Sequence, residues 1–143
     1  MEFEERIEMK IEELFIGAWV NTKHGYAKIS SIYQAFSGYA HVSYIDADGI
    51  KYDCVTLDEI EPIELTSEIL EKNGWKPYEP WYDRQAIPTY YLGCLNGSKI
   101  QQYEWEKTWR LYRTFDYHSP ALRYVHELQK AYQLLHIENN IVI

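Results

Sequence analysis

Closely spaced turn signals between residues 19 and 63 constrain the fold more than any other feature of this chain. Alternating apolar and polar segments lie at 19–21, 26–33, 39–45 and 50–55, and a further segment follows at 57–63. Gly25, Gly38 and the Asp46-Ala47-Asp48-Gly49 turn separate them. Segments rich in β-branched and aromatic residues between tight turns are typical of antiparallel strands. Four or five of them within about 50 residues predict a small, strongly bent antiparallel barrel.

Short helical signals flank the predicted barrel. Ile7, Ile11 and Leu14 recur at helical spacing and predict a short helix or helical turn that ends at Gly17. After the barrel, Thr66 is a favourable N-cap and Asn73-Gly74 a favourable C-terminal stop. These residues predict a helix of about two turns.

The second half of the chain predicts a separate sheet and one long helix. Strands are expected at 89–95, 98–105 and 108–115, with Asn96-Gly97 as the hairpin turn between the first two. Ser119 as N-cap and Pro120 at the first helical position predict the start of the helix. Its expected apolar face consists of Ala121, Val125, Leu128, Tyr132 and Leu135. The terminal segment 141–143 is expected to dock as a last strand.

These elements together predict an α+β protein. We expect residues 1–64 to form a helical turn and a small SH3-like antiparallel barrel. Residues 65–143 are expected to form an antiparallel sheet packed by the long C-terminal helix, and to pack with the first part as one unit. The residue pattern changes at Asn73-Gly74, and Pro77, Pro80 and Pro88 follow. These residues predict an irregular segment at the boundary between the two parts of the chain.

The charge is concentrated in the first half of the chain. The 143 residues include 22 Asp and Glu and 14 Lys and Arg, which gives a net charge of -8. Residues 1–75 contribute 15 of the acids and 6 of the bases. This balance argues against a protein that coats phosphate backbones. An acidic N-terminus and the absence of a long apolar run predict a cytoplasmic protein without a signal peptide or membrane span.

The cysteines fit a reducing compartment. Cys54 and Cys94 belong to no CxxC pair, and a secreted disulfide scaffold of this length contains more cysteines. No cationic neighbour in the sequence favours a reactive thiolate at either residue.

Three segments resemble a family of small uncharacterised bacterial proteins that are often encoded near prophages and mobile elements. They are Ile16-Gly17-Ala18-Trp19-Val20, the segment 60–75 (IEPIELTSEILEKNGW) and Arg123-Tyr124-Val125-His126-Glu127-Leu128-Gln129. Trp75 stands where the family usually has Phe. The resemblance implies a compact bacterial accessory protein, and it transfers no catalytic residue.

No chemical motif in the sequence is complete. His126-Glu127 begins an HExxH pattern, but Lys130 stands where the second zinc-binding imidazole belongs. The Asp46–Gly49 segment lacks the spacing of a calcium loop. GxGxxG, P-loop and GxSxG patterns do not occur. We therefore expect no catalytic residue, no metal and no cofactor.

Aromatic side chains are the candidates for binding a partner protein or a second copy of the chain. Rigid aromatic rings often anchor protein interfaces. The predicted protein-binding residues are Trp19, Tyr39 and Tyr44 in the barrel and Trp75 and Trp81 near the prolines. Tyr26, Tyr33 and Tyr52 are further aromatic candidates in the barrel. The alternative is that about half of the barrel aromatics pack the core and that Trp75 and Trp81 clamp the linker.

Binding of nucleic acid is the competing function. Lys107, Arg110, Arg113 and Arg123 interleave with aromatic residues, and stacking combined with basic charge suits single strands. In a strand, Arg110 and Arg113 point to opposite faces, whereas a helix over 103–115 brings Lys107 and Arg110 together. The net negative charge disfavours this alternative.

Overall fold

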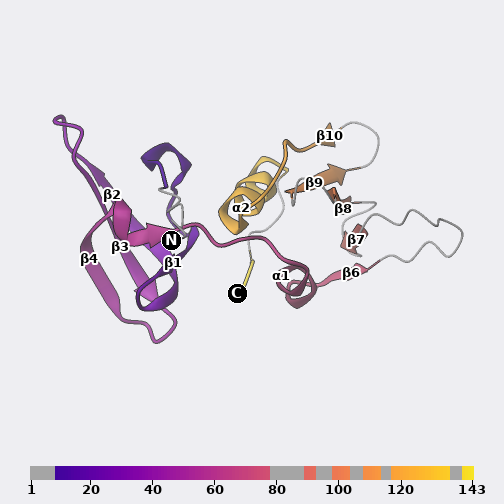
Figure 1. Cartoon of the computed structure of the whole chain (residues 1–143), viewed down its shortest axis with the longest axis horizontal. Helices are drawn as coiled ribbons and strands as arrows, with labels where there is room; N and C mark the ends of the chain where they lie inside the picture. Colours follow the sequence, from indigo (N-terminus) through magenta and orange to yellow (C-terminus); the bar gives the residue numbers. More distant parts are fainter. Residues whose placement is uncertain (1–8, 78–88, 93–97, 104–107, 114–116, 136–139) are drawn as a thin grey trace, which may run out of the picture. The chain divides into compact units, whose positions relative to one another are not determined.

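The computed structural model describes residues 9–77, 89–92, 98–103, 108–113, 117–135 and 140–143. The chain divides into two compact units, Met1–Ile63 and Glu64–Ile143. Each unit contains its own antiparallel sheet of five strands (Figure 1). The protein is therefore α+β, and each unit is described separately below.

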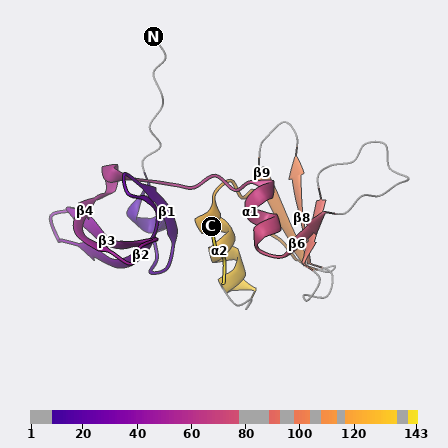
Figure 2. The same ribbon diagram turned by 90° about the horizontal axis from the view of Figure 1, so that it is seen from below.

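The first unit is built on a curled sheet with the strand order β4-β3-β2-β1-β5. The 3-10 helix η1 (Ile11–Glu13) precedes β1 (Trp19–Thr22), β2 (Gly25–Gln34), β3 (Ala40–Asp46) and β4 (Lys51–Thr56). A second 3-10 helix, η2 (Leu57–Glu59), leads into the short strand β5 (Ile60–Glu61). The curl of this sheet is visible in Figure 2. The strands predicted at 19–21, 26–33, 39–45 and 50–55 are confirmed, whereas segment 57–63 begins with η2 and supplies only the two-residue strand β5. The predicted helical turn corresponds to η1, and Ile7 lies outside the described residues.

A bulge in the long strand β2 helps the sheet to curl. The pairing of β2 with β3 shifts between Ile29 and Ser31, so that Ser30 is an extra residue on β2. Such bulges bend a strand and increase its twist. The apolar side chains gather on the inside of the curl: Met9, Leu14, Ala18, Val20, Ala27, Ile29, Val42, Tyr44, Val55 and Ile60.

A second bulge lies in β4, which forms one end of the sheet order. Val42 pairs with Val55 and Tyr44 with Tyr52, so two residues of β4, Asp53 and Cys54, lie opposite Ser43 alone. Cys54 has a positive φ of 57°, in the left-handed region that disfavours residues with a Cβ atom. Its side chain is exposed and its thiol is free.

Replacing Cys54 by glycine is expected to stabilise the first unit by about 1 kcal/mol, because glycine adopts a positive φ without steric cost. The matched change Lys51→Gly, also exposed and on β4, lacks this benefit and is expected to destabilise it. Urea denaturation of the two variants measures both effects. A loss of stability in Cys54→Gly contradicts the strain assigned to this residue.

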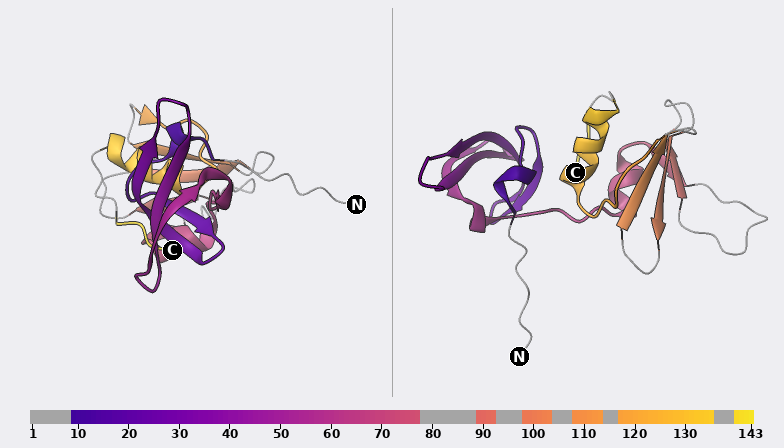
Figure 3. Two further views of the ribbon diagram at one scale, coloured as in Figure 1. Left: turned by 90° about the vertical axis from the view of Figure 1, so that its left-hand side faces the viewer. Right: turned by 90° about the horizontal axis from the view of Figure 1, so that it is seen from above.

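The second unit contains a sheet with the order β10-β9-β8-β7-β6. Helix α1 (Ser67–Lys72) leads into β6 (Trp75–Pro77), which is followed by β7 (Thr89–Leu92), β8 (Ser98–Tyr103), β9 (Thr108–Arg113) and β10 (Tyr117–His118). Helix α2 (Val125–Leu134) completes the unit. Both helices lie on the same side of this sheet (Figures 2 and 3).

The predicted caps of α1 are confirmed. The Thr66 hydroxyl accepts a hydrogen bond from the Ile69 amide at 3.3 Å. Asn73 closes the helix, and Gly74 follows it with a φ of 89°. A positive φ at this position is typical of a residue that ends a helix.

The predicted start of the long helix is wrong. Helix α2 begins at Val125, six residues after Ser119, and Ala121 is exposed outside it. Ser119 instead extends the pairing of β9, because its hydroxyl accepts the Leu111 amide at 2.8 Å and its own amide donates to the Leu111 carbonyl. Leu122 then exchanges backbone hydrogen bonds with Trp109. Tertiary pairing thus holds residues 119–124 extended, against their local helical signal.

The predicted last strand at 141–143 is also wrong. This segment is bound by a side chain: the Asn73 carboxamide donates to the Val142 carbonyl and accepts the Val142 amide, both at 2.7 Å. The attachment keeps Ile141 buried in the second unit. In the described part of the chain, no helix has the length and apolar character needed to cross a bilayer.

Candidate functional site

An exposed group of aromatic side chains lies where β2 and β3 are joined. It consists of Tyr33, Phe36, Tyr39 and His41, and is called the aromatic patch below. Tyr33 and Tyr39 are 53% and 54% exposed, and Phe36 is fully exposed. Large apolar side chains gathered on a surface often mark an interaction site.

The turn between the strands explains the exposure of Phe36. The Gly38 amide donates to the Ala35 carbonyl at 3.0 Å, and the Ala35 amide donates to the Tyr39 carbonyl at 2.8 Å. Phe36 and Ser37 are therefore the central residues of a four-residue turn, where side chains point into solvent. Gly38 supplies the required positive φ of 85°.

The strand register brings the other three rings together. Tyr33 pairs directly with His41 across β2 and β3, and Tyr39 lies two residues from His41 on the same face. The ring centroids of Tyr33 and His41 are 4.7 Å apart, and those of Tyr39 and His41 are 5.8 Å apart. The three rings thus form a row with His41 at its centre. Val42, the next residue along β3, points into the core.

Carboxylates lie beside this row on the side of β4. Thr56 pairs directly with His41, and its hydroxyl donates a hydrogen bond to the Asp58 carboxylate. Asp58 is exposed. Asp53 accepts a hydrogen bond from the Ser43 hydroxyl at 2.8 Å and forms an exposed ion pair with Lys51 at 3.7 Å. Both carboxylates therefore bind neighbours of His41: Thr56 is its strand partner, and Ser43 follows it on β3.

A second aromatic group lies at the opposite end of β3. The His24 and Tyr52 rings stack with centroids 4.0 Å apart, and the buried Tyr44 ring is 5.1 Å from Tyr52. Partial burial, reinforced by the charge of Asp46 and by a hydrogen bond to its carboxylate, raises the pKa of the Tyr52 phenol above its usual value. Asp46 also accepts the Asp48 and Ile50 amides, both at 2.9 Å. This group stabilises the β3–β4 turn.

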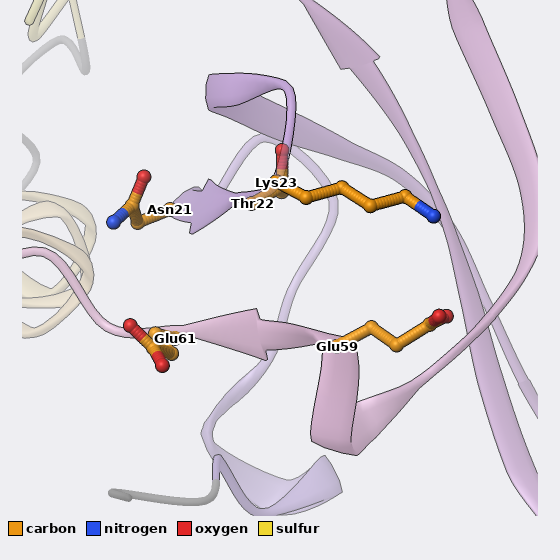
Figure 4. Close-up of a pocket in the computed structure, with 5 residues that line it drawn as sticks. All are labelled: Asn21, Thr22, Lys23, Glu59 and Glu61. Carbon is orange, nitrogen blue, oxygen red and sulfur yellow. The ribbon is translucent and has the colours of Figure 1, made fainter. Parts of the chain in front are cut away.

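A polar pocket of about 380 Å³ lies over β1 and β5. Asn21, Thr22, Lys23, Glu59 and Glu61 line it. Lys23 and Glu59 extend in one direction and Asn21 and Glu61 in the other (Figure 4). The Thr22 hydroxyl is occupied in the turn, donating to the Gly25 carbonyl and accepting the His24 amide. These side chains provide no activated nucleophile of the kind that enzymes use.

Two of the five predicted protein-binding residues are core residues. Tyr44 is 2% exposed within the first unit and Trp75 is 1% exposed within the second. The Trp75 indole N–H donates to the Tyr132 hydroxyl at 2.7 Å. Neither ring is accessible to a partner, so their assignment to a binding surface is corrected to a packing role.

The other three predicted residues have different positions. Trp19 is half-buried, and the Lys28 ammonium lies 5.0 Å from the centre of its ring. Tyr39 belongs to the aromatic patch. Trp81 lies outside the described residues.

The basic residues of the nucleic-acid alternative are spread over different structural elements. Arg110 is half-buried in β9, and Arg123 is exposed with its guanidinium 5.3 Å from the centre of the Tyr124 ring. Arg113 also lies in β9, but its side chain is outside the described residues, as is all of Lys107. The predicted strands are confirmed at 98–103 and 108–113, so the alternative of a helix over 103–115 does not hold.

Sequence reasoning missed Phe36, His41 and Asp58 as members of a surface site. Pairing the predicted strands 26–33 and 39–45 around Gly38 places position 33 opposite position 41 and Phe36 in the turn, so a signal for the patch was present. Asp58 carries no such signal, because its position depends on η2 and on the Thr56 hydroxyl.

Among the described residues, no group of three or more His, Cys, Asp and Glu side chains is placed to hold a metal ion. Comparison of the chain with protein-family models, with curated proteins and with solved structures finds no match.

Proposed function

We propose that the protein is a non-enzymatic accessory protein of the bacterial cytoplasm that binds a segment of another protein through the aromatic patch. The single observation that carries this proposal is the row of Tyr33, His41 and Tyr39 rings, with both tyrosines exposed, next to the turn that carries the fully exposed Phe36. Aromatic side chains are the residues most enriched among the energetic anchors of protein interfaces. Burying them against a partner removes a large apolar area from water.

The proposal includes an SH3-like identity for the first unit. Its support is the strand order β4-β3-β2-β1-β5, the long bulged strand β2 and the 3-10 helix between β4 and β5. In a small curled sheet of this kind, the loops at its ends carry the variable side chains that contact ligands. The aromatic patch is at such a loop.

The pocket over β1 and β5 supports a non-enzymatic role. Catalytic sites generally place a nucleophile or an acid–base group in a concave, partly desolvated position. Here Lys23, Glu59 and Glu61 are exposed and the Thr22 hydroxyl is held by the turn. The aromatic patch is therefore the stronger candidate for a functional surface.

Selection from a displayed library of short random peptides tests the proposal. We expect peptides that bind the wild-type protein to lose about tenfold or more in affinity to the double variant Phe36→Ala, Tyr39→Ala. The matched control is Tyr26→Ala, Ile50→Ala, which also removes two exposed apolar side chains but lies away from the patch. Fluorescence anisotropy of labelled peptides measures the affinity of each variant for the selected peptides.

Recovery of no peptide, or equal binding to the patch variant and the control variant, rules out the aromatic patch as a protein-binding surface. Light scattering of the same proteins shows whether the aromatic patch binds a second copy of this chain. In that case the wild type is a dimer and the patch variant a monomer.

A further inference from the structure

We infer that the aromatic patch receives an arginine side chain from an extended segment of the partner protein. The inference rests on the proposed function, and it names the chemistry of the ligand. It follows from three observations: which rings already carry a cation, which carboxylate binds the strand partner of His41, and how the charge of the first unit is distributed.

Three described aromatic rings are covered by a cation of the chain itself. Lys28 lies over Trp19 at 5.0 Å, Lys99 over Tyr112 at 5.3 Å and Arg123 over Tyr124 at 5.3 Å. Tyr33 and Tyr39 have only His41 as an aromatic neighbour and no cation from a described residue. Their exposed faces carry the same negative quadrupole that attracts lysine and arginine elsewhere in this chain.

A carboxylate completes the environment of the patch. Asp58 accepts a hydrogen bond from the hydroxyl of Thr56, the strand partner of His41, and among the described residues it forms no ion pair. Exposed tyrosine faces and a carboxylate without an ion pair favour a cationic group over a neutral apolar one. The described part of the first unit, residues 9–63, contains eight Asp and Glu and four Lys, so its field also attracts a cation.

The geometry favours a guanidinium over an ammonium group. A guanidinium is planar, weakly hydrated and able to stack on one ring while it donates two parallel hydrogen bonds to a carboxylate. The ring planes of Tyr33 and Tyr39 are tilted by 32° and 49° from that of His41, so each presents its face at an angle to the row. An ammonium group is a compact and strongly hydrated point charge, and gains less from such faces.

Amide NMR titrations with three acetylated hexapeptides test this inference directly. The peptides are Gly-Arg-Gly-Arg-Gly-Arg and the same sequence with Lys or Gln in place of Arg. We expect shift changes centred on Tyr33, Tyr39, His41 and Asp58 with the arginine peptide. Changes with the lysine peptide are expected to be weaker, and the glutamine peptide is expected to cause none.

The variant Tyr33→Leu separates recognition of a cation from simple apolar contact, because leucine keeps apolar bulk but has no ring face. It is expected to reduce affinity for the arginine peptide about two- to fivefold, and Asp58→Asn by a similar factor. The control Tyr26→Leu lies on the same strand, about 20 Å away along it, and is expected to bind as the wild type does. Circular dichroism of each variant verifies that it is folded.

Two results overturn the inference while the proposed function stands: equal binding of the arginine peptide to wild type and Tyr33→Leu, or patch-dependent peptides from the library that contain no cationic residue. Equal or tighter binding of the lysine peptide overturns the assignment to arginine. A library without any patch-dependent peptide overturns the proposed function instead. If the arginine peptide still binds in the NMR titration in that case, the patch is a cation-binding site that does not recognise a segment of a partner protein.

Discussion

Trp109→Ala is expected to lower the free energy of unfolding of the second unit by about 3–5 kcal/mol. Trp109 is completely buried in β9, which lies between β10 and β8 in the sheet. Its indole N–H donates to the Leu65 carbonyl at 3.1 Å, and its ring lies 5.7 Å from that of Tyr90. Its backbone exchanges two hydrogen bonds with Leu122. Truncation therefore removes a large apolar volume at the point where β9 meets the segments before α1 and α2.

Urea denaturation followed by circular dichroism measures this loss. Trp109→Phe is the informative companion, because it keeps most of the ring and leaves the Leu65 carbonyl without its donor. The free energy of unfolding is expected to fall by about 1–3 kcal/mol in Trp109→Phe. Leu134→Ala removes a leucine that is exposed on α2 and serves as the control with little effect. A loss below about 1 kcal/mol for Trp109→Ala contradicts the central packing role of this residue.

Asn73→Ala is expected to cost about 2–3 kcal/mol, because one side chain makes three hydrogen bonds of roughly 1 kcal/mol each. Its amide nitrogen donates to the Ile69 carbonyl at 2.8 Å and to the Val142 carbonyl at 2.7 Å. Its oxygen accepts the Val142 amide at 2.7 Å. Loss of the two hydrogen bonds to Val142 releases segment 140–143 and exposes Ile141.

Hydrogen exchange at the Val142 amide reports this release. We expect its protection to disappear in Asn73→Ala, while amides at the centre of β9 stay protected. Asn73→Asp is the sharper variant, because it keeps the acceptor for the Val142 amide and replaces the donor by a carboxylate that repels the Val142 carbonyl. In Asn73→Asp, we expect the protection of the Val142 amide against exchange to be intermediate or lost. Full protection in both variants contradicts the attachment of the C-terminal segment by Asn73.

The strands of the first unit were predictable because their signals are local. Glycines and the Asp46–Gly49 turn lie at the strand boundaries, and alternation along 26–33 and 39–45 matches a sheet with one buried face. The caps at Thr66 and Asn73 were predictable for the same reason, since each acts within its own helix. The bulges at Ser30 and Cys54 have no comparable sequence signal.

The start of the last helix was not predictable because a long-range interaction overrides a good local signal. Ser119-Pro120 has the form of a helix N-terminus, yet the Ser119 hydroxyl is used by the Leu111 amide. The helix begins instead where the Glu127 carboxylate accepts the Arg123 and Tyr124 amides. Leu122 pairs with Trp109 before the helix can form.

The candidate site was predictable only in part. Residue type identified aromatic anchors, but it does not separate Tyr39, which is exposed, from Tyr44, which lies five residues further along the chain in the core. Strand parity and the bulges decide which face each ring occupies. The link from Asp58 to Thr56, the strand partner of His41, is a hydrogen bond between side chains, which no sequence pattern encodes.

The bulge at Asp53 and Cys54 also affects how this protein behaves at high concentration. A terminal strand offers unpaired amides and carbonyls to strands of other chains, and such pairing can propagate into fibrils. On β4, the left-handed backbone conformation of Cys54 interrupts the regular spacing of the backbone amides and carbonyls. The Lys51–Asp53 ion pair places charged side chains beside these backbone groups. A protein that displays exposed aromatic rings where β2 and β3 are joined is prone to association. The irregular margin of β4 opposes polymerisation through the edge of the sheet.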